Sequence, residues 1–271
     1  MSTRMAAKAV LSSLIPVVAM WGVVAVPAGA QVTGPGPIDS VDHFPIAYGF
    51  KIPGGSTANL KQCLPGSFGI PANSPNCGLV PTPNPTQPIS AFNNFPTEVF
   101  YWLANAKSSV NGVQGLLVLS TQATFASGSV VDGQQITFSR IRIRVSGVTA
   151  GAWYKVTHPY GVGLNGNAYL QADSKKGINA TANYGCAAVT APACDFALLT
   201  TPLNPLNQGI LSWDSGAPIG FLGDGATAHQ VTGSPYGTNV FKVERVNPTT
   251  GVVIGSPVIN QPLFTVVGAI Q

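Results

Sequence analysis

The chain has 271 residues, of which 8% are charged and 45% hydrophobic, and it contains 31 glycines and 23 prolines. This apolar content excludes a disordered polar chain, and the density of glycine and proline excludes a helical bundle. The formal net charge is +4 with no basic run, which argues against nucleic-acid binding. A chain of this length is expected to form one large β domain or two small ones.

The first 30 residues have the parts of an export signal. Arg4 and Lys8 give a positive start, residues 9–26 carry no charge, and an A-x-A cleavage pattern ends at Ala30. We therefore expect residues 1–30 to be a cleaved signal peptide and the protein to be secreted or held at the cell envelope. The alternative is an uncleaved membrane anchor, but the small residues at its end favour cleavage. No second hydrophobic stretch of that length follows, so we expect no membrane span after cleavage.

Export makes disulfides the expected state of the four cysteines. Four cysteines allow three pairings, and we favour the local one, Cys63 with Cys77 and Cys186 with Cys194. Both loops contain proline and small residues that need an external constraint, which a covalent closure supplies. A zinc site fits less well, because the chain has no C-x₂-C pair and no histidine near either pair. We expect no metal and no cofactor.

The residue composition of the mature chain changes near residue 97. Residues 31–96 are rich in proline and glycine, with an extended proline run at 81–88. Beyond them, runs of β-branched, aromatic and aliphatic residues alternate with Gly, Pro and Asn turns. We therefore expect a loop-rich segment over 31–96, packed on a β domain over 97–271. The predicted fold class is all-β, an antiparallel β-sandwich or jelly-roll-like barrel, because no helical period appears in the mature chain.

The clearest predicted strand covers residues 136–145 (ITFSRIRIRV). Its apolar residues stand at even positions up to Phe138 and at odd positions from Ile141 onward. Side chains of a strand alternate with period two, so a strand changes parity only through a bulge or bend. We expect that irregularity at Ser139–Arg140.

Beyond the expected irregularity, Arg140, Arg142 and Arg144 share one face of the strand. Two interpretations compete. The arginines form a binding site for an anionic polysaccharide or carboxylate, or they form a solvated outer face that discourages edge aggregation. The second is what any half-buried strand shows, since charged residues then lie opposite the apolar row.

Several catalytic motifs are absent or stand in the wrong context. Residues 161–166 match G-x-G-x-x-G, but a dinucleotide site needs this loop to open a helix, and the next segment is predicted to be a strand. No G-x-S-x-G elbow occurs. Glycoside hydrolysis needs two facing carboxyl groups, and the chain has only nine Asp and Glu residues from which such a pair could come. Several of them, such as Asp132 and Asp224, stand in turns where the side chain commonly caps backbone amides.

Histidines and aromatic residues are the remaining candidates for a site. We expect His43, His158 and His229 to be hydrogen-bonded structural residues rather than bases, although a Ser–His–Asp triad has no fixed motif because geometry alone defines it. Aromatic residues either stack on sugar rings or pack in the core, and the core is their more frequent place. They are Tyr101, Trp102, Trp153, Tyr154, Tyr160, Trp213 and Tyr236. The candidate binding residues are thus Arg140, Arg142, Arg144, His158, Tyr160 and His229.

Five sequence blocks stand out when taken together. They are NFP with FYW at 94–102, VDGQQ to RIRIR at 131–144, VTHPYG at 156–161, CDF at 194–196 and HQVTGSPYGTN at 229–239. In these blocks the chain resembles an uncharacterised family of exported bacterial β-rich proteins, over nearly the whole mature length. The resemblance implies secretion or surface display and a β-rich fold. It implies no reaction and no catalytic residues.

These observations predict an exported, non-catalytic β-sandwich protein with an interaction or binding role at the cell envelope or outside the cell. The expected partner is a glycan or another envelope protein. The alternative is an extracellular carbohydrate-active hydrolase. The two differ in how the acids are used, because an enzyme needs carboxyl groups that converge in a cleft with a shifted pKa.

Overall fold

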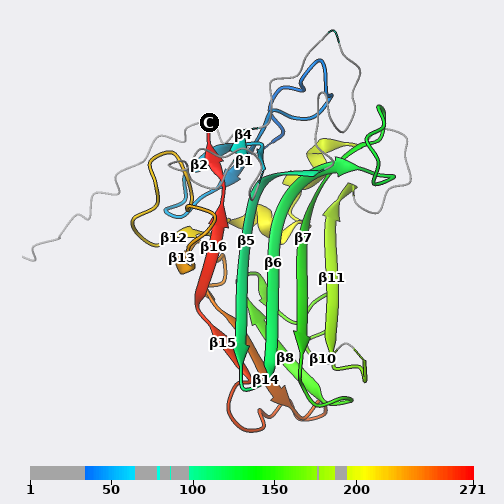
Figure 1. Cartoon of the computed structure of the whole chain (residues 1–271), viewed down its shortest axis with the longest axis vertical. Helices are drawn as coiled ribbons and strands as arrows, with labels where there is room; N and C mark the ends of the chain where they lie inside the picture. The colour runs from blue at the N-terminus through cyan, green and yellow to red at the C-terminus, as the bar shows by residue number, and fades with distance from the viewer. Residues whose placement is uncertain (1–33, 65–77, 80–85, 87–97, 176, 187–193) are drawn as a thin grey trace, which may run out of the picture. The chain divides into compact units, whose positions relative to one another are not determined.

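The computed structural model describes residues 34–64, 78–79, 86, 98–175, 177–186 and 194–271 (Figure 1). The predicted signal peptide, Cys77 and the proline run except Thr86 lie outside the described residues. Residues Val32–Gln271 form one compact unit. Every strand pairing among the described residues is antiparallel, and the predicted all-β class is confirmed. No helix in this part of the chain has the length and apolar character needed to cross a membrane.

The largest sheet has nine strands, and its long strands β5, β6, β7 and β11 lie side by side in Figure 1. Its main path runs β11-β7-β6-β5-β16-β13-β12, and β3 joins β4 to β5. The strands are β3 (Cys63–Leu64), β4 (Gly78–Leu79), β5 (Glu98–Val110), β6 (Val113–Phe125), β7 (Gln135–Ser146), β11 (Ile178–Gly185), β12 (Ser212–Trp213), β13 (His229–Thr232) and β16 (Leu263–Val267). Between β5 and β6, Asn111 and Gly112 have φ values of 51° and 78°, as a type I′ hairpin turn requires.

A second sheet has five strands in the order β10-β8-β14-β15, with β9 paired to β8. They are β8 (Trp153–His158), β9 (Gly161–Val162), β10 (Leu170–Gln171), β14 (Phe241–Val246) and β15 (Ile259–Gln261). This sheet packs on the first one so closely that a Cβ on Gly115 of β6 would lie 2.3 Å from Ile259 and 2.9 Å from Phe241. Side chains from the two facing layers form one core, as in a β-sandwich.

The third sheet joins the front of the described chain to its end. It has three strands in the order β1-β2-β17, which are β1 (Ala47–Lys51), β2 (Thr57–Lys61) and β17 (Ala269–Ile270). Tyr48 and Phe50 of β1 are fully buried. The proline- and glycine-rich front of the chain therefore supplies strands and core residues to the β unit.

Strand β7 differs from the prediction in its irregularity. Its pairing with β6 runs from Gln135 to Ser146 without a shift, so there is no bulge at Ser139–Arg140. The register shift in this sheet lies in β5, between Phe100 and Trp102. The odd-numbered side chains of β7 are buried along its whole length, and we call this side, which faces the second sheet, the inner face.

The parity argument failed because polar residues occupy part of the inner face. Thr137 and Ser139 are fully buried there. The Thr137 hydroxyl lies 2.8 Å from Tyr48 Oη, and Ser139 Oγ accepts a 3.0 Å hydrogen bond from Asn204. Asn204 precedes the short 3₁₀ helix η3 (Pro205–Gln208), which follows η2 (Phe196–Thr200). Hydrogen bonds remove most of the penalty for burying a hydroxyl, so polarity did not reveal the face.

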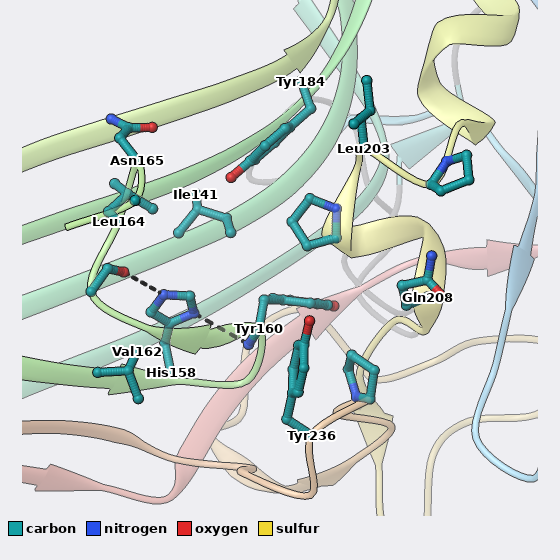
Figure 2. A pocket seen from close by; sticks show the side chains of 15 residues that line it. Ile141, His158, Tyr160, Val162, Leu164, Asn165, Tyr184, Leu203, Gln208 and Tyr236 are labelled. Carbon is teal, nitrogen blue, oxygen red and sulfur yellow. Dashed lines mark hydrogen bonds between the residues drawn. The ribbon is translucent and has the colours of Figure 1, made fainter. Parts of the chain in front are cut away.

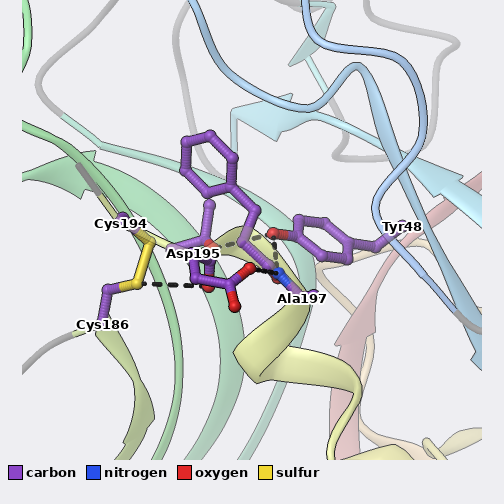
Figure 3. The surroundings of a disulfide bond; sticks show 7 residues. Tyr48, Cys186, Cys194, Asp195 and Ala197 are labelled. Atoms are coloured by element: carbon purple, nitrogen blue, oxygen red, sulfur yellow. Dashed lines mark hydrogen bonds between the residues drawn. A yellow bond between two sulfur atoms is a disulfide. The ribbon is translucent and has the colours of Figure 1, made fainter.

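The predicted disulfide between Cys186 and Cys194 is confirmed, with 5.7 Å between the Cα atoms (Figure 3). Next to it, the Asp195 carboxylate accepts a 3.0 Å hydrogen bond from the backbone N–H of Ala197 and caps η2. The bond thus joins the end of β11 to the start of η2. Cys63 is buried, but its predicted partner Cys77 lies outside the described residues, so that pairing stays a prediction.

Candidate ligand-binding cleft

A hollow of about 640 Å³ lies against the inner face of the large sheet, over Ile141 of β7 and Tyr184 of β11 (Figure 2). Four segments line it: the inner face of β7 and β11, the turn and loop over 158–166, the segment 202–208, and residues 235–236. We call it the tyrosine cleft. Its volume falls within the range of small-molecule sites, roughly 300–1,000 Å³.

His158 stands at the end of β8 and is only 2% exposed. Its Nδ1 accepts a 3.2 Å hydrogen bond from the backbone N–H of Tyr160, and its Nε2 donates to the carbonyl of Gly163 at 2.9 Å. An amide can only donate and a carbonyl can only accept, so the ring is neutral with its proton on Nε2. Burial also lowers the pKa of His158 below its usual value, which favours the neutral ring. The ring therefore holds the turn in shape and has no free nitrogen to offer a substrate.

The loop over 161–166 turns back tightly against β8. Gly163 has a φ of 71°, and a Cβ there would lie 1.8 Å from the carbonyl of Asn167, so only glycine fits. Asn165 also has a positive φ, and its amide donates to the carbonyl of Thr181 on β11 at 3.2 Å. The element after this loop is β10, not a helix. The G-x-G-x-x-G match is therefore not in the context of a dinucleotide site, as expected.

Three tyrosines face the cleft from different segments (Figure 2). Tyr160 is 6% exposed and packs edge-to-face on Trp102, with 6.3 Å between ring centroids. Its hydroxyl is buried and has no hydrogen-bond partner among the described residues. Tyr184 lies on the inner face of β11, and Tyr236 stands at the rim with 62% of its surface exposed. In Figure 2 the hydroxyl of Tyr236 points toward that of Tyr160.

Two of the sequence blocks meet at this cleft. Ser234 donates from its hydroxyl to the carbonyl of Pro159 at 2.6 Å, and Thr238 donates to the carbonyl of His158 at 3.0 Å. Ser234 Oγ also accepts from the backbone N–H of Tyr236 at 3.2 Å. These bonds tie the HPYG turn to the SPYGT turn and so place Tyr160 and Tyr236 on adjoining walls.

The cleft is uncharged. None of the described residues that line it is Asp, Glu, Lys or Arg. Its polar groups are tyrosine hydroxyls and the amides of Asn165 and Gln208, and burial raises the pKa of Tyr160 well above its usual value. Tyr160 is thus a neutral hydroxyl at any ordinary pH. Sequence reasoning missed Tyr184, Asn165 and Gln208, because nothing local distinguishes them from other surface residues.

The acids lie outside the cleft, and two of them cap turns. Asp132 accepts from the backbone N–H of Gly133 at 2.9 Å, and Asp224 accepts from the N–H of Thr227 at 2.7 Å, so both cap turns as expected. Glu244 is buried on β14, with its carboxylate 3.2 Å from the ammonium of Lys242. Among the described residues, no carboxylate lines the tyrosine cleft.

The three arginines of β7 share the outer face of the sheet, opposite the cleft side. Arg140 donates to Asn183 at 2.9 Å, and its guanidinium lies 4.8 Å from the ring centroid of Phe138. Glu98 on β5 brings an opposite charge to Arg140 and Arg142, although burial keeps the pKa of Glu98 above its ordinary value. Arg144 is exposed and borders a separate hollow of about 610 Å³. Anion binding by this face stays a prediction.

His229 lies on β13 and does not line the cleft. Its ring stacks on Trp213 with 4.6 Å between centroids, and its Nδ1 lies 3.1 Å from Asp214. Ser215 also donates to Asp214, at 3.3 Å. In a catalytic triad the serine bonds to the histidine. Here Ser215 and His229 both contact the same oxygen of Asp214, and the serine is not bonded to the histidine. This cluster therefore lacks the hydrogen-bond chain of a catalytic triad.

Within the described ranges, no group of three or more His, Cys, Asp or Glu side chains is placed to hold a metal ion. Comparisons of the chain with family models, with curated proteins and with solved structures found no significant match. The resemblance carried by the sequence blocks therefore stays a prediction, and the function has to be argued from the cleft itself.

Proposed function

We propose that this chain is an exported, non-catalytic binding protein that acts at the cell envelope or outside the cell, with the tyrosine cleft as its ligand site. One observation carries this proposal. The cleft combines aromatic and proline walls with neutral hydroxyl and amide groups, and among its described lining residues there is no Asp, Glu, Lys or Arg and the one histidine has both ring nitrogens engaged by the main chain. Concave sites that combine apolar walls with a few placed polar groups are typical of ligand binding.

The argument against catalysis is chemical. General acid–base catalysis needs a group that faces the substrate and has a pKa near the working pH. Both nitrogens of His158 are engaged by the main chain, and the hydroxyl of Tyr160 stays protonated. A glycosidase would need two carboxyl groups on either side of the bond to be broken. The described lining residues supply neither carboxyl group.

Export is supported by the charged start, apolar stretch and A-x-A pattern of the first 30 residues. The disulfide between Cys186 and Cys194 supports it as well, since disulfides persist mainly in oxidising compartments outside the cytosol.

Two experiments test the proposal. N-terminal sequencing of protein recovered from the medium or envelope should begin at or near Gln31, whereas a membrane-bound chain beginning near Met1 would refute cleavage. A glycan array followed by a turnover assay on a polysaccharide panel should show binding without hydrolysis. Hydrolysis that is abolished by Glu98→Gln or Glu244→Gln would replace the proposal with the hydrolase alternative.

A further inference from the structure

We infer that the tyrosine cleft takes a neutral oligosaccharide, with sugar ring faces against Tyr184 and Tyr236 and sugar hydroxyls on the polar groups of the cleft. This inference rests on the proposed function, because it names the ligand class of the same site. Three features of the cleft support this inference. They are the lack of charged side chains among its described lining residues, a buried hydroxyl without a partner, and the combination of aromatic rings with amide groups.

The charge of the cleft decides between neutral and ionic ligands. A carboxylate, sulfate or phosphate ligand would lose its hydration on entering and would need a cation in return. The described lining residues offer none, and His158 cannot take up a proton without breaking its hydrogen bond from Tyr160. The cationic side chains of β7 lie on the outer face of the sheet. A ligand without charge is therefore the one that the cleft accommodates.

The hydroxyl of Tyr160 points to a ligand with hydrogen-bonding groups. Tyr160 is only 6% exposed, and its hydroxyl has no partner within the described part of the chain. Buried polar groups in native proteins almost always have a partner. Figure 2 shows this hydroxyl next to that of Tyr236 at the wall of the cleft, so a ligand that displaces the exposed Tyr236 side chain would reach it. A sugar hydroxyl supplies the missing partner, since it both donates and accepts.

The walls of the cleft suit the two kinds of surface that a sugar presents. Tyr236 is 62% exposed and Leu203 is 84% exposed, so the rim offers apolar surface to water. Faces of sugar rings carry C–H groups that pack on such rings, while their edges carry hydroxyls. The amide of Gln208 makes no hydrogen bond to the described residues, and Asn165 uses only its nitrogen, toward Thr181. Acceptors and donors are thus both present beside the rings.

A proline-rich peptide is the competing occupant, because extended proline segments also dock in grooves lined by aromatic residues. Such a segment offers pyrrolidine rings and carbonyl acceptors but few donors, as proline has no N–H. The cleft presents free acceptors as well as donors, on Asn165, Gln208 and Tyr160. This balance favours a polyhydroxylated ligand over a proline-rich one.

The test compares binding of defined probes to the purified exported protein by calorimetry. The probes are neutral trisaccharides of glucose, galactose, mannose and N-acetylglucosamine, together with every neutral glycan that scores on an array. A trigalacturonate serves as the charged probe and the peptide PTPNPTQP, the sequence of residues 81–88, as the proline-rich probe. We expect at least one neutral saccharide to bind and neither of the other two probes.

Variants locate the site and separate binding from folding. Tyr236→Ala should raise the Kd of the saccharide about ten-fold, whereas Tyr236→Phe, which keeps the ring, should change it far less. Tyr160→Phe should also weaken binding, yet leave the melting temperature unchanged or higher, because it removes a buried hydroxyl that lacks a partner. Ile219→Ala is the control: Ile219 is fully exposed and does not line the cleft.

Each other outcome counts against one particular claim. Binding of the peptide or of trigalacturonate alone, or no neutral saccharide on the whole array, overturns the ligand class. Saccharide binding that survives both Tyr236→Ala and Tyr160→Phe overturns the placement in this cleft. Turnover of a bound saccharide leaves the ligand class intact and refutes the non-catalytic function instead.

Discussion

Among single residues, His158 shows how burial sets the protonation state. Burial lowers its pKa from 6.5 because the charged ring would lose its hydration, although the hydrogen bond to Gly163 acts in the opposite direction. The unfolded chain therefore takes up this proton at a higher pH than the folded chain. The resulting stabilisation is fully present above about pH 6.5 and is lost as the pH falls through the lower folded pKa. We expect the free energy of unfolding to decrease on acidification.

Urea unfolding between about pH 7.5 and pH 5 measures this effect, with His158→Asn as the matched variant. The asparagine amide oxygen can accept from the N–H of Tyr160 in place of Nδ1, although the shorter side chain loses the bond to Gly163, and the amide does not titrate. The wild-type protein should lose more stability over this range than the variant does. Equal pH dependence in the two proteins would contradict the assignment of the titration to His158.

Asp42 is the opposite case, and it destabilises the fold at neutral pH. It is 2% exposed, and burial raises its pKa from 3.8 to about 6, against the effect of a hydrogen bond from the N–H of Phe44. A raised pKa means that the stability is greatest below the unfolded value of 3.8 and is lost as the pH rises through about 6. We expect Asp42→Asn, which keeps the acceptor, to raise the free energy of unfolding at pH 8 by on the order of 2 kcal/mol.

The gain from Asp42→Asn should fall to a few tenths of a kcal/mol at about pH 3.5, because the carboxyl is then mostly protonated in both the folded and the unfolded state. Asp224→Asn is the control. Burial alone raises the pKa of Asp224, but hydrogen bonds from Thr227 and Ala226 together bring it below its ordinary value. Neutralising Asp224 should therefore fail to stabilise the protein at pH 8. A gain at pH 8 for Asp224→Asn, or none for Asp42→Asn, would show that the carboxylate at 42 is not the unfavourable one.

At the scale of elements, the short 3₁₀ helices complete the inner face of β7. Asn204 is buried, donates to Ser139 at 3.0 Å and to the carbonyl of Leu199 at 2.7 Å, and caps η3 through the N–H of Leu206 at 3.1 Å. One side chain thus connects the strand to both helices. Because η3 ends at Gln208, Asn204 also sets the position of one wall of the tyrosine cleft.

We expect Asn204→Ala to lower the free energy of unfolding by about 2–4 kcal/mol, since it leaves buried groups unpaired and removes a cap. Chemical denaturation measures the loss. Asn204→Ser keeps a cap acceptor without adding a charge but cannot reach Ser139 and Leu199, so its loss should show how much of the effect comes from those two bonds. A loss below about 1 kcal/mol for Asn204→Ala would mean that the helices do not depend on this side chain.

At the scale of the whole molecule, stability depends on how closely the two main sheets approach. A Cβ at Gly115 would lie 2.3 Å from Cδ1 of Ile259. Gly115→Ala should therefore overpack the interface and destabilise the protein by about 1–3 kcal/mol. Ile259→Val removes that one atom, so the double variant should be less destabilised than the sum of the two single variants.

Thermal or urea unfolding of the four proteins forms a double-mutant cycle. Gln114→Ala, on the exposed neighbour of Gly115, should change little and serves as the control. Strict additivity of Gly115→Ala and Ile259→Val would indicate that the sheets separate to admit the methyl group.

The sequence predicted those features of the fold that local rules govern. Period-two alternation, β-branched residues and Gly, Pro and Asn turns indicated an all-β chain, and the structure confirms it. The turn contexts of Asp132 and Asp224 and the local pairing of Cys186 with Cys194 also follow from neighbours in the chain. In each case the partners are close in sequence, so no knowledge of distant contacts is needed.

For the candidate site, the sequence by itself determined only which chemical groups are present: few acids, three histidines and a set of aromatic residues. The tertiary structure decided which of them meet. Thr238 reaches the carbonyl of His158 across 80 positions of the chain, and Asn204 reaches Ser139 across 65. Those bonds place Tyr160 and Tyr236 on one cleft and bury polar residues where alternation predicted apolar ones. Hydrogen bonds between distant segments offset the penalty of burying such groups, and polarity along the chain carries no record of those partners.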